Sequence, residues 1–329
     1  MKHIGRLALF LFLAVNAFFI GMLLLTAYSP YINPEVHPVQ SCLGLTFPIF
    51  LVINFCFLVF WLIVRYRLAL VPLLGFLLCY PQIRTYMPFN MGPSGQPENS
   101  IKLLSYNIMS FGNMKKENGQ NPILNYIKNS KADIVCMQEY AGSETAKIHL
   151  NNKEIRQALK DYPYRHIKQV GKTGAGSQIA CYSKFPILSA RMLDYQSNYN
   201  GSMVYDIKIG KDTVLLINNH LESNKLTRED KVVYEDMLKD PKAGKVKSGI
   251  RQLVNKLAEA SAIRSAQARA IAQEIARSPY PSVIVCGDFN DSPISYAHRV
   301  ISQDLDDAFT ESGRGLGISY NQNKFYFRI

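Results

Sequence analysis

The stretch that decides how this chain folds is residues 282–293, Ser-Val-Ile-Val-Cys-Gly-Asp-Phe-Asn-Asp-Ser-Pro. Its first half is a run of β-branched and apolar residues, which is typical of a buried strand. A glycine ends the run, and Asp288 and Asn290 follow at once. Polar groups that directly follow a buried strand lie at the edge of a sheet, where a rigid scaffold can hold a site.

Three other apolar runs also end in polar side chains, namely Asn107, Glu139 and His220. Each of these residues alone has an ordinary explanation as a turn former, a cap or a structural histidine. Their joint occurrence at four strand ends predicts one shared site. Carboxylates and amides without a thiolate are typical of Mg²⁺, Mn²⁺ or Ca²⁺ sites, and zinc is disfavoured.

The rest of this region alternates short β-like runs with helical stretches. Strands joined mostly by short turns, with few helices between them, favour stacked sheets flanked by helices over a doubly wound parallel sheet. We predict strands at 101–107, 133–137, 179–183, 203–209, 213–218 and 282–286, helices at 122–131, 154–160 and 251–277, and a loop around 241–249.

The helix at 251–277 is predicted to pack on the outside of the sheets through one apolar face. Its apolar residues recur at spacings of three to five, at Leu253, Leu257, Ala260, Ile263, Ala266, Ala270 and Ile275. Arg264 and Arg269 then fall on or beside the polar side, where we expect them to be solvated. The alternative is that one of them helps to place a substrate.

The first 86 residues have a different composition from the rest. They carry five Lys or Arg residues against a single acid, Glu35, so +4 of the net charge of +12 lies there and +8 in the remainder. Apolar runs at about 7–27 and 43–64 are long enough to cross a bilayer, and a third, at 68–83, is shorter. We therefore expect two or three transmembrane helices within 1–87, a Pro/Gly/Ser/Asn-rich linker at 88–100 and a further domain at 101–329.

The orientation of these helices follows from the basic residues of the short loops. Lys2 and Arg6 precede the first run, and Arg65 and Arg67 separate the second from the third. Basic residues flanking membrane helices favour the cytoplasmic side. If the third run crosses, residues after Arg84 lie outside the cytoplasm; if it is re-entrant, they stay inside.

Four motifs, taken in order, resemble those of the endonuclease/exonuclease/phosphatase superfamily. They are L-S-Y-N-I at 104–108, M-Q-E at 137–139, N-H-L at 219–221 and G-D-F-N-D-S-P at 287–293. The resemblance implies a four-layered α/β sandwich with two packed, mostly antiparallel sheets, the deoxyribonuclease-I-like fold. It also implies metal-dependent hydrolysis of phosphoester bonds.

The resemblance implies a role for each residue of the site. Glu139 resembles the principal Mg²⁺ (or Mn²⁺) ligand, with Asn107 and Asp288 contributing. Asp288 also resembles the carboxylate that orients or deprotonates the attacking water. Asn290 is similar to the amide that holds the phosphorane, and His220 to the histidine that contacts the scissile phosphate or protonates the leaving oxygen.

The end of the sequence departs from the family pattern. The family continues past an Arg-Ile pair into Asp and closes with Ser-Asp-His, whereas this sequence ends at Arg328-Ile329. We expect a fragment of a longer chain in preference to a degenerate copy, so that 101–329 lacks the C-terminal end of its domain. We expect the chain as given to hydrolyse phosphodiesters poorly.

The function expected from these features is that of a phosphodiesterase, a metal-dependent hydrolase anchored in the cytoplasmic membrane. Nucleic acid, a phospholipid or phosphoinositide headgroup and an inositol phosphate all remain open as substrates. The alternative is a catalytically inactive phosphate-binding module. The bilayer is the expected partner, and the sequence indicates no protein partner.

Reporter fusions after Asn99 test the orientation. We expect an alkaline phosphatase fusion to be active and a fluorescent protein fusion at the same position to stay dark, because the basic loops together with a third crossing would place residue 99 outside the cytoplasm. Bright fluorescence with inactive phosphatase would reverse the assignment.

Overall fold

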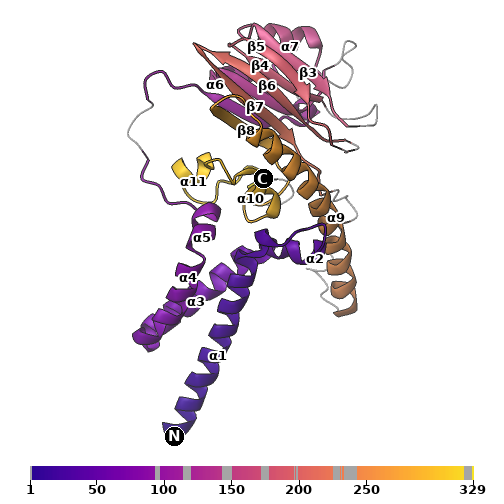
Figure 1. The fold of residues 1–329 in the computed structure, drawn as a ribbon. Coiled ribbons are helices and arrows are strands. Elements are labelled where there is room, and N and C mark those ends of the chain that lie inside the picture. The colour runs from indigo at the N-terminus through magenta and orange to yellow at the C-terminus, as the bar shows by residue number, and fades with distance from the viewer. Residues whose placement is uncertain are drawn as a thin grey trace. The chain divides into compact units, whose positions relative to one another are not determined.

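The computed structural model describes residues 2–92, 97–113, 120–142, 150–171, 178–195, 197, 199–224, 230, 232, 243–321 and 328–329. These residues form two compact units, which are described separately below (Figure 1). The sandwich unit comprises Pro93–Ser223 and Arg269–Asn290. The membrane-helix unit comprises Met1–Gly92, Asn224–Ala268 and Asp291–Ile329.

The sandwich unit is built on two four-stranded sheets, with strand orders β1-β2-β4-β3 and β5-β6-β7-β8. The pairs β1/β2 and β7/β8 are parallel and the other pairs are antiparallel, which confirms the predicted two mostly antiparallel sheets. The strands are β1 Leu103–Asn107, β2 Ile134–Tyr140, β3 Tyr164–Gln169, β4 Gln178–Ser183, β5 Ile187–Met192, β6 Gly201–Ile209, β7 Asp212–His220 and β8 Ser282–Asp288.

Alternation along the strands divides the apolar side chains between two cores. On β2, Ile134 and Cys136 pack with Met203 and Tyr205 of β6, in the core between the sheets. The intervening residues of β2 pack instead against helices α6 (Pro122–Ser130) and α7 (Asn152–Ala158). A strand buried on both faces reads as a continuous apolar run, which explains why β2 was found from the sequence.

Two strands were not predicted, and both lie at sheet edges. β3 reads Tyr-Arg-His-Ile-Lys-Gln and β5 reads Ile-Leu-Ser-Ala-Arg-Met, and most of their side chains are exposed or half-buried. These two edge strands bury little and carry charges that discourage pairing with another chain, so their sequences lack the apolar pattern that the edge strands β1 and β8 keep.

A polar link crosses the apolar core between the two sheets. Gln138 Nε2 donates to Asn218 Oδ1 of β7 at 2.6 Å and to Ser105 Oγ of β1 at 3.3 Å. Asn218 Nδ2 in turn donates to the carbonyl of Ala180 in β4. Because an unpaired amide in this core would be costly, the link fixes how the two sheets are aligned.

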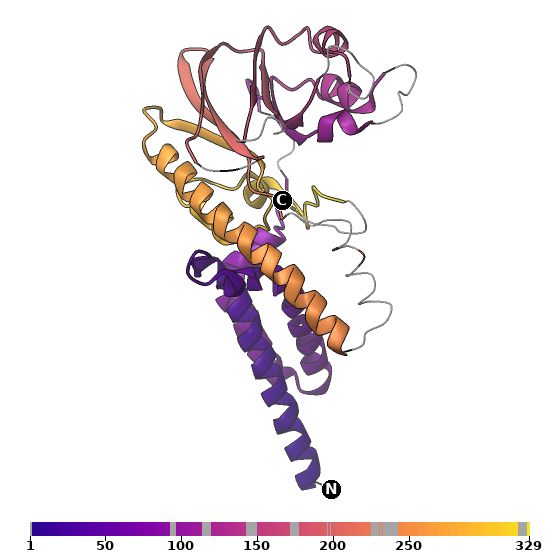
Figure 2. The ribbon, with the colours of Figure 1, turned by 90° about the vertical axis from the view of Figure 1, so that its right-hand side faces the viewer.

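The membrane-helix unit contains two helical segments long and apolar enough to cross a membrane, Arg6–Tyr31 and Pro38–Val64. The third apolar run forms two helices bent by 68° at a break, so it is either a broken span or a re-entrant loop. Figure 2 shows α1 and α3 side by side. The elements are α1 Lys2–Ala27, η1 Ser29–Tyr31, α2 Pro38–Ser41, η2 Cys42–Thr46, α3 Phe47–Val64, η3 Tyr66–Ala69, α4 Leu70–Leu78 and α5 Tyr80–Tyr86.

The polar residues that interrupt the apolar runs pair with each other. Trp61 Nε1 donates to Asn16 Oδ1 at 3.0 Å, and Asn54 Nδ2 donates to the carbonyl of Phe19 at 2.9 Å. Asn16 and Asn54 are fully buried. Buried amides need hydrogen-bond partners, so these residues favour the pairing of α1 with α3.

Helix α9 (Ala243–Ala276) differs from the sequence prediction at its start and in its buried face. The loop expected around 241–249 is helical from Ala243, and Ala266 of the predicted apolar stripe is exposed. The buried face instead contains small and polar residues, which pack closely but escape a search for apolar periodicity. They are Ala258, Ala260, Ser261, Arg264, Ser265, Gln267, Ala268 and Ile271.

Two short helices follow in the membrane-helix unit, α10 (Tyr296–Ile301) and α11 (Ala308–Ser312). His298 Nε2 lies 2.8 Å from Asp307 Oδ2, between the two helices. Burial opposes ionisation of Asp307, but hydrogen bonds from His298 and the Thr310 N–H, with the charges of His298 and Arg328, outweigh it and hold the pKa of this carboxyl below its ordinary range.

The parallel strands β7 and β8 approach closely at Gly287. Its φ is +135°, and a Cβ on this residue would lie 2.0 Å from the carbonyl oxygen of Asn219. Only glycine fits at this position. Residues with a side chain rarely adopt this φ, and every one of them has a Cβ that would clash with the Asn219 carbonyl.

Replacing this glycine tests the close approach. We expect Gly287→Ala to destabilise the full-length protein in detergent by roughly 3 kcal/mol, the upper part of the range for strained backbone positions. Gly210→Ala is the matched control, because Gly210 also has a positive φ (+59°) but open space around its Cβ; we expect a loss of about 1 kcal/mol. Equal shifts of the two thermal unfolding midpoints would contradict the steric argument.

Candidate active site

The carboxyl ends of four strands bring the predicted polar residues together in the sandwich unit. Asn107 ends β1, Glu139 lies near the end of β2, His220 ends β7 and Asp288 ends β8. Because β1/β2 and β7/β8 are parallel pairs, the ends of each pair lie at the same edge of their sheet. Both sheets therefore contribute to one group of polar side chains.

The Asn107 amide lies between two carboxylates. Its Nδ2 donates to Glu139 Oε1 at 3.0 Å and to Asp288 Oδ2 at 2.9 Å, and so joins the two sheets. Its Oδ1 accepts the N–H of Met109, at the start of the 3₁₀ helix η4 (Met109–Asn113). In this arrangement Asn107 acts as a donor to the carboxylates, and its contribution to metal binding stays a prediction.

Glu139 owes its position to an irregularity in β2. The pairing with β4 shifts by one residue between Met137 and Tyr140, and Glu139 has φ +51°. A bulge of this kind redirects a side chain, and a positive φ on a residue other than glycine is a strained conformation typical of functional sites. The Glu139 side chain is 37% exposed, so its carboxylate is open to solvent.

His220 lies beside Glu139 and is buried. Its Nε2 is 3.7 Å from Glu139 Oε1, a distance at which the two form an ion pair when the imidazole is protonated. In the neighbouring strands its partners in register are Gly201 and Asp288. Next to it, Asn219 Oδ1 accepts from Ser202 Oγ at 2.6 Å. Ser202 also contacts the Tyr195 hydroxyl, whose pKa is raised by burial so that it stays protonated.

Backbone and amide contacts fix the turn after β8. The Asn290 N–H donates to Asp288 Oδ1 at 2.9 Å, and Asn290 Nδ2 donates to the carbonyl of Leu221 at 2.9 Å. The Leu221 N–H donates to the carbonyl of Asp288. Asn290, with φ +51°, thus stabilises the turn through its backbone and its side chain. Its contact with a phosphate stays a prediction.

The carboxylates Glu139 and Asp288 are the groups of this site that could hold a cation. Among the residues that the structure describes, no group of three or more His, Cys, Asp or Glu side chains is arranged to hold a metal ion. Two hard carboxylates close enough to accept from the same amide NH2 group still match a Mg²⁺ site, since such sites use one or two carboxylates together with waters and substrate phosphate.

Sequence reasoning missed a buried carboxylate near the site. Glu222, two residues after His220, is buried and accepts from Ser197 Oγ at 2.8 Å. Glu222 follows the N-H-L motif directly, so its position next to a predicted site residue could have identified it from the sequence.

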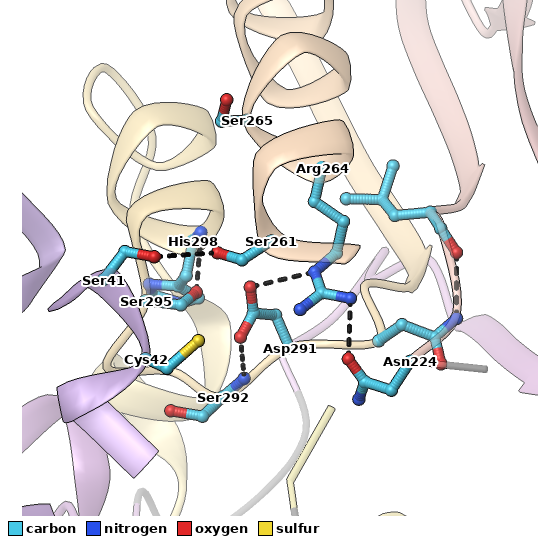
Figure 3. Close-up of polar contacts among 12 residues, drawn as sticks. Ser41, Cys42, Asn224, Ser261, Arg264, Ser265, Asp291, Ser292, Ser295 and His298 are labelled. Atoms are coloured by element: carbon cyan, nitrogen blue, oxygen red, sulfur yellow. Dashed lines mark hydrogen bonds and ion pairs between the residues drawn. The ribbon is translucent and has the colours of Figure 1, made fainter. Parts of the chain in front are cut away.

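A second buried polar cluster lies in the membrane-helix unit, directly after the turn in the sequence (Figure 3). Arg264 of α9 is only 3% exposed; its Nε donates to Asp291 Oδ2 at 3.0 Å and its Nη1 to Asn224 Oδ1 at 2.9 Å. The expectation that Arg264 is solvated was therefore wrong. Its carboxylate partner lies within the G-D-F-N-D-S-P motif, but the sequence did not show which cation pairs with it.

Comparison with known proteins assigns the family. The model of the endonuclease/exonuclease/phosphatase family matches residues 104–327, and a model described only as a domain of unknown function (DUF8431) matches residues 9–86. A comparison with curated protein sequences gives no match. The chain belongs to the endonuclease/exonuclease/phosphatase family.

Solved structures similar to this chain include three enzymes or toxins of low sequence identity. Beta toxin from Staphylococcus aureus is 16% identical, with 63% of this chain and 73% of that chain covered and a TM-score of 0.41. Sphingomyelinase C from Streptomyces griseocarneus is 18% identical, with 64% and 70% covered and a TM-score of 0.40. D. rerio TDP2, complexed with single strand DNA product, is 16% identical, with 66% and 65% covered and a TM-score of 0.37.

The family supports a general activity for this chain. Its members are hydrolases of phosphoester bonds, and the polar group at the four strand ends occupies the positions of the motifs that carry the resemblance. Hydrolysis of a phosphoester is therefore the reaction class that family and site together support.

The buried ion pair of Arg264 gives a stability prediction. We expect Arg264→Met to destabilise the full-length protein by roughly 3–5 kcal/mol, because it leaves the buried carboxylate of Asp291 without its cation. The double variant Arg264→Met/Asp291→Leu should recover most of this loss. Arg251→Gln, an exposed position of the same helix, should change the unfolding midpoint little. An equally small effect of Arg264→Met would mean that the ion pair contributes nothing.

Proposed function

We propose that this protein is a membrane-anchored, divalent-metal-dependent phosphodiesterase whose catalytic part lies outside the cytoplasm. The observation that carries the proposal is the Asn107 amide shared between Glu139 and Asp288, with His220 beside Glu139. Two neighbouring carboxylates are a concentration of negative charge that repels a phosphodiester unless a cation intervenes. The two helices long enough to cross a membrane support the anchoring.

Mg²⁺ or Mn²⁺ is the proposed cofactor, with Glu139 as its principal ligand and Asp288 and Asn107 contributing. The solvent-exposed carboxylate of Glu139 suits a cation that keeps several waters. When bound, the cation would neutralise the phosphate charge and stabilise the charge that develops in the transition state.

The protein's own residues supply the remaining steps of the proposed mechanism. Asp288 takes a proton from the attacking water, and the Asn107 amide and the Asn290 N–H hold its carboxylate in place. The water oxygen bonds to phosphorus as one P–O ester bond breaks. His220 then gives a proton to the leaving alkoxide, and the products are a phosphomonoester and an alcohol.

Nucleic acid and phospholipid headgroups are the two substrate classes of this proposal. Both contain phosphodiesters, and the net positive charge of the chain attracts either. A phosphate-binding module without activity is the alternative, and the experiment below distinguishes it from an enzyme.

Carboxylate-to-amide variants of the full-length protein test the proposal. With bis(p-nitrophenyl) phosphate and Mn²⁺, we expect Glu139→Gln and Asp288→Asn each to lose at least about 10²-fold in rate. Asp206→Asn, at a carboxylate of β6 that accepts from Ser189 Oγ, should keep the wild-type rate.

Metal removal and metal binding complete the test. EDTA should abolish turnover and added Mn²⁺ should restore it, and calorimetric titration should show weaker Mn²⁺ binding by Glu139→Gln than by Asp206→Asn. Turnover that persists in EDTA would exclude the metal-dependent mechanism. Mn²⁺ binding without any turnover would instead favour the inactive binding module.

A further inference from the structure

Three thiols meet in the apolar core between the two sheets of the sandwich unit. Cys136 of β2 and Cys181 of β4 are fully buried in the cluster that contains Met203 and Tyr205 of β6, and Cys286 of β8 packs against the same cluster. All three cysteines belong to the sandwich unit and are free thiols. The function proposed above uses none of them.

The register of the sheet places Cys136 and Cys181 directly opposite each other. Both side chains face the same core, so they are neighbours on one face of the sheet. At the start of this ladder the Lys184 N–H donates to the Asp133 carbonyl at 2.9 Å, which marks a hydrogen-bonded pair of residues. Such pairs alternate with non-hydrogen-bonded pairs along two antiparallel strands, so Cys136 and Cys181, three positions further along, form a non-hydrogen-bonded pair.

A non-hydrogen-bonded pair has a spacing that a disulfide can bridge. The Cα atoms of such a pair are about 4.5 Å apart. Disulfides join residues whose Cα atoms are roughly 4.4–6.8 Å apart, so the pair lies at the short end of this range. The backbone of β2 and β4 can therefore keep its pairing when Cys136 and Cys181 are joined.

Cys286 contacts Cys136 but is not placed to form a disulfide with it. Hydrogen bonds with the Cys181 and Cys286 thiols, together with burial, raise the pKa of the Cys136 thiol well above its ordinary value. Cys286, however, comes from the other sheet, and the backbones of two stacked sheets are about 10 Å apart. This separation exceeds the roughly 7 Å beyond which two cysteines need a backbone movement to be joined.

The row of side chains continues from the thiols to the open edge of the sheet. His166 of the edge strand β3 lies opposite Cys181 in register and is only half-buried, and its ring centroid lies 5.7 Å from that of Tyr205. Within the described part of the chain, His166 Nδ1 and the Tyr205 hydroxyl are buried without a hydrogen-bond partner. A molecule as small and polar as water thus has unpaired polar atoms to bind beside the thiols.

We propose that Cys136 and Cys181 are a redox-active dithiol that hydrogen peroxide oxidises to a disulfide, while Cys286 stays a thiol. The sulfur of one thiolate of the pair bonds to a peroxide oxygen and the O–O bond breaks, which gives a sulfenic acid and a hydroxide that takes up the thiol proton. The second sulfur bonds to the sulfenic sulfur, the S–O bond breaks, and water leaves. In all, the two thiols lose two electrons and two protons, and one peroxide becomes two waters.

The disulfide would join β2 to β4 immediately before the irregularity that positions Glu139. The pairing of the two strands shifts between Met137 and Tyr140, directly after Cys136. A slip of β2 by one residue would turn Cys136 to the other face of the sheet. The disulfide therefore forms only in the register that carries the irregularity, and it then holds that register. The dithiol shares no residue with the candidate active site, and its oxidation does not depend on the proposed phosphodiesterase function.

Mapping of disulfide-linked peptides tests the proposal. The full-length protein in detergent carries Cys56→Ala, which removes the exposed thiol of α3. It is treated with hydrogen peroxide, its remaining thiols are alkylated in denaturant, and its peptides are analysed by mass spectrometry. We expect a Cys136–Cys181 link in at least about tenfold excess over any link to Cys286, because only the first pair has the required backbone spacing. Cys286→Ala is the matched control and should keep the yield of this link within about twofold.

Thermal unfolding gives a second measurement that needs no peptide mapping. The oxidised protein should unfold at least about 4 °C above the reduced protein, because a disulfide constrains the unfolded chain, and dithiothreitol should reverse the shift. Cys181→Ala should abolish the shift, and Cys286→Ala should keep it.

Three outcomes would overturn the proposal. A link from Cys286 to either partner would show that the sheets move enough to choose another pair. Sulfinic or sulfonic acids without a link would show that the two thiols do not react with each other. Complete alkylation of all three thiols after peroxide treatment would show that burial makes them inert.

Discussion

One amide nitrogen, Nδ2 of Asn107, holds the two carboxylates of the candidate site close together. It donates to a carboxylate from each sheet, Glu139 of β2 and Asp288 of β8, and these two groups would otherwise repel each other. The same residue anchors the start of η4 through its carbonyl oxygen. A neutral donor between the two charges lowers the cost of bringing the strand ends together, and a polar link through Gln138 and Asn218 aligns the sheets beneath them.

The sequence predicted those parts of the fold that apolar burial dictates. The strands with a continuous apolar run and the polar residues at their ends were found, because an apolar run followed by a turn residue leaves a clear pattern. The edge strands β3 and β5 were not found, since they bury little. The buried face of α9 was misassigned because alanine, serine and glutamine form it and its one cation is paired internally.

The site was predictable as a set of residues but not as a geometry. The strand-end pattern identified Asn107, Glu139, His220 and Asp288, which the structure brings within hydrogen-bond or ion-pair distance of one another. That Asn107 acts as a donor, and that Asn290 braces Leu221, depend on contacts between residues far apart in the chain. No local pattern encodes such contacts. The packing of Ile294 among membrane helices is of the same kind, since it joins segments about 250 residues apart.

The irregularity in β2 places the protein under a trade-off between stability and activity. Met137 pairs with Ala180 and Tyr140 with Gln178, so β2 has one residue more than its partner over this interval. A chain shortened by one residue here would pair with β4 without interruption and would relieve the positive φ of Glu139. A selection of random variants for thermostability would therefore favour such deletions. Each deletion would, however, remove Glu139 or point its carboxylate away from the site. The extra residue thus interrupts the regular pairing of β2 with β4 and gives the candidate site its exposed carboxylate.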